Sequence, residues 1–217
     1  MISILMPIYN GIEFLEESIN SILNQSYTEW ELIIGINGHP PNSEVFQKAK
    51  VFESTKIKIY DLINIKGKSN ALNKMLKYCN YDWISLLDVD DKWMPNKLEK
   101  QIPYMTKYDV IGTGCKYFGD KTNIPTIPYG DISNFNFFRV NPIINSSCLV
   151  KKELCYWGVK YNKGCQDYDL WLRLRKQGKK FYNIKEILVL HRIHTESHFN
   201  AKGNNLLVPE LHKVHMK

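Results

Sequence analysis

Apolar runs alternate with amphipathic segments through the first 91 residues of this 217-residue chain. Short apolar or alternating runs predict strands, and segments with apolar residues every three or four positions predict helices. The predicted strands are Ile2–Ile8, Trp30–Ile36, Ile57–Leu62 and Trp83–Leu87, and predicted helices follow Asn10 and cover Ser43–Phe52 and Asn70–Tyr78. This alternation is typical of an α/β fold with a mostly parallel central sheet and helices on both faces. The ends of the strands, including Tyr9, Asn37 and Asp88, should then meet along one rim.

The pattern is less regular after Asp91. It predicts helices at 97–105 and 167–177, extended segments at 110–118, 147–150 and 187–191, and a helix stop at Gly178. The tail after His194 has little periodicity, so we expect it to be mobile or truncated. Because no internal repeat or linker divides the chain, the sequence predicts a single domain.

Composition indicates a globular protein. Hydrophobic residues make up 44% of the chain, and five of them are tryptophans. No apolar run has membrane-spanning length, and Ile2–Met6 is too short for a signal peptide. The five cysteines form no CxxC pair, which favours reduced thiols in a cytosol-like compartment. We therefore expect a cytoplasmic protein.

Charge is distributed unevenly along the chain. Residues 1–91 hold 8 Lys and Arg against 12 Asp and Glu, whereas residues 92–217 hold 21 against 10. A basic second half is compatible with a phosphate-bearing ligand, an anionic acceptor or peripheral contact with a membrane surface. The basic residues are scattered and no nucleic-acid-binding motif accompanies them, so we expect no nucleic-acid partner. A solvated, lysine-rich surface is the simpler alternative.

Three carboxylates follow the predicted strand Trp83–Leu87, in the run Asp88-Val89-Asp90-Asp91. Alternation along an extended chain would place Asp88 and Asp90 on the same side. Two neighbouring anions repel each other unless a cation lies between them, and carboxylate oxygens suit Mg²⁺ or Mn²⁺. The alternative is an acidic turn that leads into the next helix.

Other motif matches are incomplete. Gly67-Lys68-Ser69 resembles the end of a phosphate-binding P-loop, but Leu62 stands where that motif requires glycine. No GxGxxG follows the first predicted strand, which leaves a Rossmann dinucleotide site unsupported. Cys148 and Cys155 lie in no known nucleophile motif and are better interpreted as small buried side chains.

An ordered set of motifs resembles family 2 glycosyltransferases. The set comprises 3–11 (SILMPIYNG), 21–27 (SILNQSY), 31–34 (ELII), 67–73 (GKSNALN), 87–91 (LDVDD), 97–99 (KLE), 166–174 (QDYDLWLRL) and 191–194 (HRIH). The resemblance spans about residues 1–197 and implies a three-layer GT-A fold, with a tail at 198–217. It also implies a nucleotide-sugar donor, with uridine as the expected nucleoside and guanosine as the alternative, together with Mn²⁺ or Mg²⁺. Inversion at the anomeric carbon and a glycan, lipid-linked or protein acceptor are implied as well. Residues 1–91 would bind the nucleotide sugar, and residues 92–197 would bind the acceptor and carry the catalytic base.

The resemblance implies a role for individual residues on the donor side. Pro7 and Tyr9 would line the base pocket, and Asn37 occupies a position where the family often has an aspartate that hydrogen-bonds the base. Asp88 and Asp90 correspond to the family's DXD motif, with Asp88 near the ribose and metal and Asp90 on the metal. The remaining implied residues are Lys68 and Arg192 near the diphosphate and His194 near the metal or diphosphate.

On the acceptor side, the resemblance implies that Asp167 is the catalytic base and that Trp93 and Gln166 contact the acceptor. Gln166 replaces the usual glutamate, which removes a negative charge and should lower the pKa of Asp167 relative to a typical member. The residue-level alternative is that Asp167 only caps its helix.

Two other classes of function remain open. One is a non-catalytic nucleotide- or sugar-binding relative, and the other is a nucleotidyltransferase. Against the latter, the segment Pro7-Ile8-Tyr9-Asn10-Gly11 lacks the glycine-rich, Arg-containing pattern that such enzymes usually carry.

Overall fold

Buried aliphatic side chains build one mixed sheet. The computed structural model describes residues 1–161, 164–195 and 204–216. Within these residues the strand order is β3-β2-β1-β4-β8-β6-β9-β5, and β7 pairs with β9. The strands are β1 Ile2–Ile8, β2 Trp30–Asn37, β3 Ile57–Leu62, β4 Trp83–Leu86, β5 Lys92–Trp93, β6 Val110–Gly119, β7 Gly130–Asp131, β8 Leu149–Lys151 and β9 Phe181–Ile193.

The first half of the sheet is parallel, as the strand and helix pattern predicted. Strands β3, β2, β1 and β4 all run in one direction, with β2 and β4 on either side of β1. Every residue of β2 is buried, which explains its mostly apolar sequence. Beyond β4 the sheet is mixed, because β8 runs antiparallel to both β4 and β6 whereas β6 and β9 are parallel.

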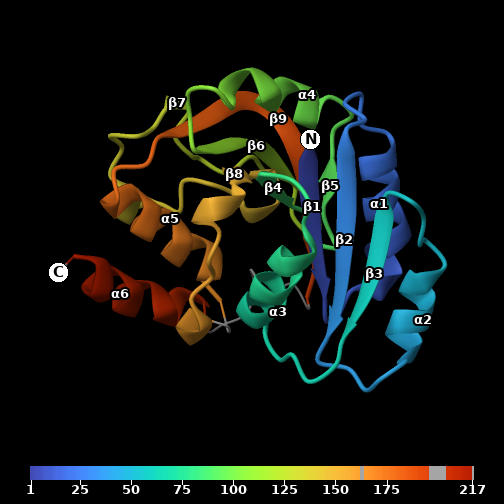
Figure 1. Cartoon of the computed structure of the whole chain (residues 1–217). Coiled ribbons are helices and arrows are strands. Elements are labelled where there is room, and N and C mark those ends of the chain that lie inside the picture. Colours follow the sequence, from blue (N-terminus) through green and yellow to red (C-terminus); the bar gives the residue numbers. More distant parts are fainter. Residues whose placement is uncertain (162–163, 196–203, 217) are drawn as a thin grey trace.

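Helices cover both faces of the sheet and give three layers (Figure 1). They are α1 Leu15–Leu23, α2 Glu44–Lys50, α3 Lys68–Met75, α4 Lys97–Gln101, α5 Gln166–Lys176 and α6 Asn204–His215. Successive residues of β1 point to opposite faces, so Ile4 and Met6 pack in one apolar core and Leu5 packs in the other. The first core includes residues of α1, and the second includes residues of α3, α5 and α6. The predicted three-layer α/β fold is confirmed.

The carboxyl-terminal segment differs from its prediction. Residues 204–215, expected to lie in a mobile or truncated tail, form helix α6, which packs beside α5 (Figure 1). Leu211 of α6 is fully buried in the second core. The predicted domain boundary at residue 197 lies outside the described residues. None of the helices that the structure describes is long and apolar enough to cross a membrane.

Candidate active site

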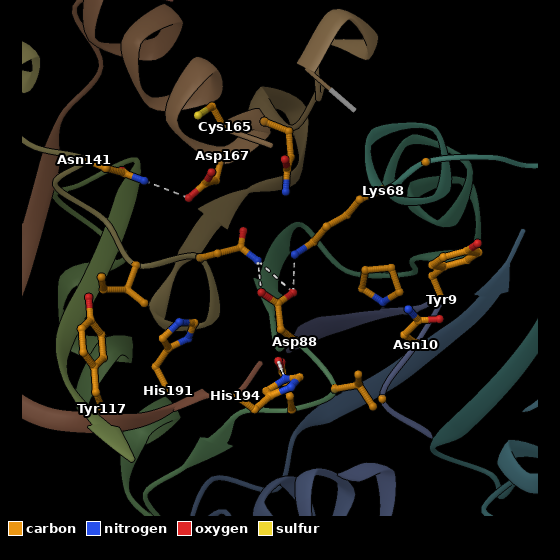
Figure 2. Close-up of a pocket in the computed structure, with 18 of the residues that line it drawn as sticks. Tyr9, Asn10, Lys68, Asp88, Tyr117, Asn141, Cys165, Asp167, His191 and His194 are labelled. Carbon is orange, nitrogen blue, oxygen red and sulfur yellow. Dashed lines mark hydrogen bonds and ion pairs between the residues drawn. The ribbon is translucent and has the colours of Figure 1, made fainter. Parts of the chain in front are cut away.

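A cavity of about 1180 Å³ lies beyond the carboxyl ends of β1 and β2. This is the place where open α/β sheets bind ligands. Most of the side chains that the sequence singled out line it, namely Pro7, Tyr9, Asn37, Lys68, Asp88, Asp90, Gln166, Asp167 and His194. Figure 2 shows Asp88 in the middle of this cavity, with Tyr9 and Lys68 on one side and Asp167 on the other. The fold thus brings together residues that are up to 187 positions apart in the sequence.

One wall of the cavity is formed by the ends of β1 and β2. Tyr9 is 58% exposed and presents its ring to solvent, whereas Asn37 is buried. Gly38 has a φ of 78°, and a Cβ atom at this position would lie 2.8 Å from the Tyr9 ring. Glycine is therefore required here, both for the backbone conformation and for the close approach of the ring. The His39 ring adds a 2.6 Å contact between its Nε2 and the Tyr9 carbonyl oxygen.

The acidic run forms a turn, and the alternation argument for Asp88 and Asp90 is wrong. Strand β4 ends at Leu86, and the Asp91 backbone N–H donates to the Asp88 carbonyl oxygen across 3.0 Å. Asp88 and Asp90 nevertheless both line the cavity. The acidic-turn alternative was therefore correct about the backbone, and the turn places two carboxylates at the site.

Asp88 is held by two donors. Lys68, on the first turn of α3, lies 2.5 Å from Asp88 Oδ1, and the Asn145 amide donates to both carboxylate oxygens at 3.0 and 3.1 Å. Burial alone would raise the pKa of Asp88, but the Lys68 ammonium and the Asn145 amide hold it below its ordinary value. Asp88 is therefore an anion that is already neutralised by Lys68.

Asp90 has a different environment. Its Oδ2 lies 3.0 Å from Nε2 of His194. Burial, together with the negative charges of Asp91 and Asp88, raises the pKa of Asp90 to about 6. This carboxylate would thus be stabilised by an additional cation in the cavity.

Asp91 supports the site from behind. Its carboxylate is fully buried and accepts hydrogen bonds from Ser146 Oγ at 2.5 Å and from the Arg192 backbone N–H at 2.9 Å. It also lies 2.9 Å from Nδ1 of His191. Burial alone would lower the pKa of His191, but the Asp91 carboxylate raises it to about 9. The imidazolium at the cavity wall is therefore charged at neutral pH.

Asp167 lies on the opposite side of the cavity, in the first turn of α5. Cys165 precedes this helix with a left-handed φ of 60°, so Asp167 is the second helical residue and does not occupy the N-cap position. The Asn141 amide donates to Asp167 Oδ2 across 3.0 Å. Burial raises the pKa of Asp167 above its ordinary value, even though the Asn141 hydrogen bond and the Lys68 charge act in the opposite direction. A carboxylate with a raised pKa is a better proton acceptor than an ordinary one.

Gln166 lines the cavity beside Asp167 and is almost fully buried. Its Oε1 is buried and has no hydrogen-bond partner within the described part of the chain. An unpaired buried acceptor costs about 1–3 kcal/mol, so Gln166 has hydrogen-bonding capacity left for a ligand.

Two predicted site residues do not line the cavity. Trp93 is 4% exposed and lies in the first core, where its indole Nε1 donates to the Ser146 carbonyl oxygen at 2.7 Å. The Arg192 guanidinium lies 4.4 Å from the ring centroid of Phe14 and 4.3 Å from that of Phe118. It donates to the Asp90 carbonyl oxygen at 3.0 Å and is ion-paired with Glu17. The expected contacts of Trp93 with the acceptor and of Arg192 with the diphosphate are therefore not supported, because both side chains are engaged elsewhere.

The sequence did not identify several residues that the fold brings to the cavity. Tyr117, Asn141, Asn145 and His191 line it, together with the segment 125–127. His191 belongs to the motif at 191–194, but its place in a predicted strand did not indicate that its side chain faces the cavity. The two asparagines lie in an irregular segment with no recognisable pattern.

The ability of the site to bind a metal ion depends on which side-chain donors line the cavity. Within residues 1–161, 164–195 and 204–216, no group of three or more His, Cys, Asp or Glu side chains is arranged to hold a metal ion. Asp90 and His194, however, place an oxygen and a nitrogen donor 3.0 Å apart at the cavity wall. Mg²⁺ and similar ions often take only one or two protein ligands and complete their coordination with phosphate and water. These donors fit such an ion.

The fold is that of GT-A glycosyltransferases. Staphylococcus aureus TarS 1–349, solved in complex with UDP-GlcNAc, has a TM-score of 0.79 over 99% of this chain and 65% of that chain, at 14% sequence identity. The mannosyltransferase PcManGT from Pyrobaculum calidifontis, solved with GDP-Man and Mn²⁺, has a TM-score of 0.68 at 14% identity and covers 99% of this chain and 68% of that one. At these identities the likeness concerns the fold.

Sequence comparison identifies the family. The model of glycosyl transferase family 2 matches residues 3–150. The O-antigen biosynthesis glycosyltransferase WbnJ of Escherichia coli is 33% identical over 213 residues, which cover 91% of this chain and 81% of that protein. The UDP-Glc:alpha-D-GlcNAc-diphosphoundecaprenol beta-1,3-glucosyltransferase WfgD of E. coli is 29% identical over 203 residues, 81% of this chain and 70% of that one. The chain belongs to glycosyl transferase family 2.

Proposed function

We propose that this glycosyltransferase moves a sugar from a nucleoside-diphosphate sugar to an acceptor hydroxyl with inversion at the anomeric carbon. UDP is the proposed nucleotide, because TarS binds UDP-GlcNAc and the name of WfgD specifies UDP-Glc. The acceptor is a hydroxyl on a glycan, a lipid-linked intermediate or a protein. The observation that carries the proposal is the placement of Asp167 across the cavity from Asp88 (Figure 2), in a cavity that Asp90 also lines.

The donor occupies the side of the cavity formed mainly by residues 1–91. The exposed Tyr9 ring stacks on the base, and the amide of Asn37 reads its polar edge. Lys68 and the charged His191 provide positive charge for the diphosphate. Asp90 and His194 would hold a divalent ion, which would supply Lewis-acid stabilisation of the leaving diphosphate.

The acceptor occupies the other side, formed by residues after 91. Asp167 accepts the proton of the attacking hydroxyl as the new glycosidic bond forms. Because Asp167 and the acidic turn lie on different sides of the cavity, the attacking oxygen and the leaving diphosphate are on opposite faces of the sugar. That arrangement gives inversion. The side-chain oxygen Oε1 of Gln166 can accept a hydrogen bond from a hydroxyl group of the acceptor.

The nucleotide is tested by calorimetry with UDP, GDP and CMP in the presence of Mn²⁺, and transfer is tested with a panel of UDP- and GDP-sugars. We expect UDP to bind most tightly and a UDP-sugar to be turned over. Binding without transfer or hydrolysis of any donor would identify a non-catalytic sugar-binding relative. Preference for CMP would show that the base pocket is wrongly assigned.

The role of Asp167 is tested by Asp167→Asn. Asparagine preserves the shape of the side chain but cannot accept the proton, so turnover should fall by roughly a hundredfold to ten-thousandfold. Donor affinity should change little, because Asp167 lies on the side of the cavity away from the proposed nucleotide site. The melting temperature should also change little, because asparagine has nearly the same shape as aspartate. Near-normal transfer by a stable Asp167→Asn variant would exclude Asp167 as the base.

A further inference from the structure

We infer that Asn141 is a positioning residue for catalysis, whose amide holds the Asp167 carboxylate in place as the proton acceptor. This inference rests on the proposed function. The Asn141 Nδ2 lies 3.0 Å from Asp167 Oδ2, and both residues line the cavity (Figure 2). Because an ionised carboxylate only accepts hydrogen bonds, the NH₂ group must be the part of the amide that faces Asp167.

The segment that carries Asn141 is tied to its surroundings on both sides. Pro142 follows Asn141 and restricts its backbone to extended conformations. The Pro142 carbonyl oxygen accepts from Asn183 Nδ2 of β9 at 2.7 Å. The Ile143 carbonyl oxygen accepts from the Trp171 indole of α5 at 3.2 Å. Since α5 also carries Asp167, the same helix orients both partners of the hydrogen bond.

A glycine makes this support possible. Asn183 lies opposite Gly112 of β6, and a Cβ atom on Gly112 would come within 2.1 Å of Asn183 Oδ1. Any other residue at position 112 would displace Asn183 and with it the carbonyl group of Pro142.

The oxygen of the Asn141 side-chain amide makes no hydrogen bond within the described residues. This atom, Oδ1, is buried. A buried acceptor without a partner destabilises the folded protein. An asparagine retained purely for stability would be expected to use both ends of its amide. The bond to Asp167 is therefore better explained by the chemistry of the site.

The hydrogen bond also affects the protonation of Asp167. The titratable groups that act on this carboxylate are Lys68 of α3, Asp88 of the acidic turn, and Cys148 and Cys165. Burial raises the pKa of Asp167, whereas the Asn141 amide and Lys68 stabilise the ionised form. Removing the amide should therefore raise the pKa further, and the acidic limb of the rate profile should move to higher pH.

The test is Asn141→Leu, which removes the amide while filling a similar space. We expect the pKa of Asp167, followed through its ¹³C-carboxyl shift and identified by the loss of that signal in Asp167→Asn, to rise by about one to two pH units. In the transfer assay, kcat at neutral pH should fall at least tenfold. The acidic limb of the profile of rate against pH should shift to higher pH by the same amount as the pKa of Asp167. Affinity for UDP should be unchanged, whereas the melting temperature at neutral pH should fall, because the buried carboxylate of Asp167 loses its donor.

Asn136→Ala is the matched control. Asn136 lies in the same connection, accepts from the Phe138 backbone N–H at 3.0 Å and does not line the cavity. It should leave both the pKa of Asp167 and the pH profile unchanged. An unchanged pKa of Asp167 in Asn141→Leu, with or without a lower melting temperature, would overturn the inference. If the wild-type protein transferred sugar from no donor, the proposed function would fail, while the carboxyl titration would still decide the role of Asn141 at Asp167.

Discussion

Three aspartates line the cavity, and each has its own partner. Asp88 is paired with Lys68, Asp90 lies against His194, and Asp167 accepts a hydrogen bond from Asn141. The pKa of Asp88 is lowered because Lys68 and Asn145 outweigh its burial, whereas burial raises the pKa of Asp90 and Asp167 in spite of their hydrogen-bond partners. The proposed function gives these three groups of one chemical type different roles, as charge partner, metal ligand and base.

At the scale of single residues, the site predicts that activity depends on a metal ion. EDTA should abolish transfer and added Mn²⁺ or Mg²⁺ should restore it, because Asp90 and His194 would hold a divalent ion that stabilises the charge of the diphosphate. Asp90→Ala should lower kcat/KM at least a hundredfold and remove the response to added metal. The exposed Asp82 is the matched control, and Asp82→Ala should behave like the wild type. Full activity in chelator would contradict the assignment.

The sequence could identify the carboxylates but not their partners. Asp88, Asp90 and Asp167 occur in motifs with a recognisable order along the chain. Asn141 and Asn145 acquire their importance only from tertiary contacts with residues 26 and 57 positions away. Trp93 and Arg192 illustrate the opposite case, since both lie in or beside motifs and yet point away from the cavity.

At the scale of elements, the end of β9 supports the acidic turn. Arg192 is held between the rings of Phe14 and Phe118, and its Nε donates to the Asp90 carbonyl oxygen. The planar guanidinium can stack and donate at the same time, which an ammonium group cannot do. Arg192 thereby links β9 to the turn and to the segment before α1.

Arg192→Lys is therefore expected to destabilise the protein by about 1–2 kcal/mol and to weaken metal binding. Arg192→Leu should have the same effect or a larger one. Thermal unfolding and Mn²⁺ titration measure both quantities. If Arg192→Lys were normal and only Arg192→Leu lost diphosphate affinity, the charge itself would act on the ligand, as the family resemblance implied.

Among the described side chains of helix α6, a buried leucine and two histidines contact the rest of the protein. Leu211 is fully buried, and the rings of His212 and His215 lie 2.8 Å from Tyr168 Oη and 2.9 Å from Asp169 Oδ1. Leu211→Ala should destabilise the protein by about 2–4 kcal/mol, as expected for a large-to-small change in a core. Val214, which is 46% exposed, is the matched control, and Val214→Ala should change stability by less than about 0.5 kcal/mol. Equal effects in denaturant unfolding would show that α6 does not pack as described.

The parallel half of the fold was predictable because buried strands leave continuous apolar runs. Strands β1 and β3 begin and end where the pattern placed them. The two-residue strands β5 and β7 are too short to produce a pattern, and they form only by pairing with β9. Strand β9 itself is longer than predicted, since the polar residues Asn183, Lys185 and Glu186 interrupt its apolar sequence.

At the scale of the whole molecule, one buried lysine makes stability depend on pH. The Lys97 ammonium lies 2.9 Å from Gln101 Oε1, 3.2 Å from Ser85 Oγ and 3.9 Å from the centroid of the Trp93 ring. Burial lowers the pKa of Lys97 from 10.5 to about 7. Between these values the unfolded chain binds more protons than the folded protein, so stability should increase as the pH rises above 7.

Lys97→Met should remove this dependence. The slope of unfolding free energy against pH should decrease by up to about 1.4 kcal/mol per pH unit between about pH 7 and 10. Urea unfolding at pH 7, 8 and 9 measures it. The half-exposed Lys100 provides the control, and Lys100→Met should retain the wild-type slope. An unchanged slope in Lys97→Met would mean that Lys97 stays charged in its buried position.

The contact between the acidic turn and β9 has a consequence for how the protein is made. Asp91 and His191 are 100 positions apart, and Asp90 and His194 are 104 apart. During synthesis, β1 to β4 can pair soon after they leave the ribosome, but the turn lacks its supporting partners until residues 191–194 have emerged. A nascent chain can thus acquire half of its sheet before it acquires any working site. Such distant pairings also make the final step of folding slow compared with the first.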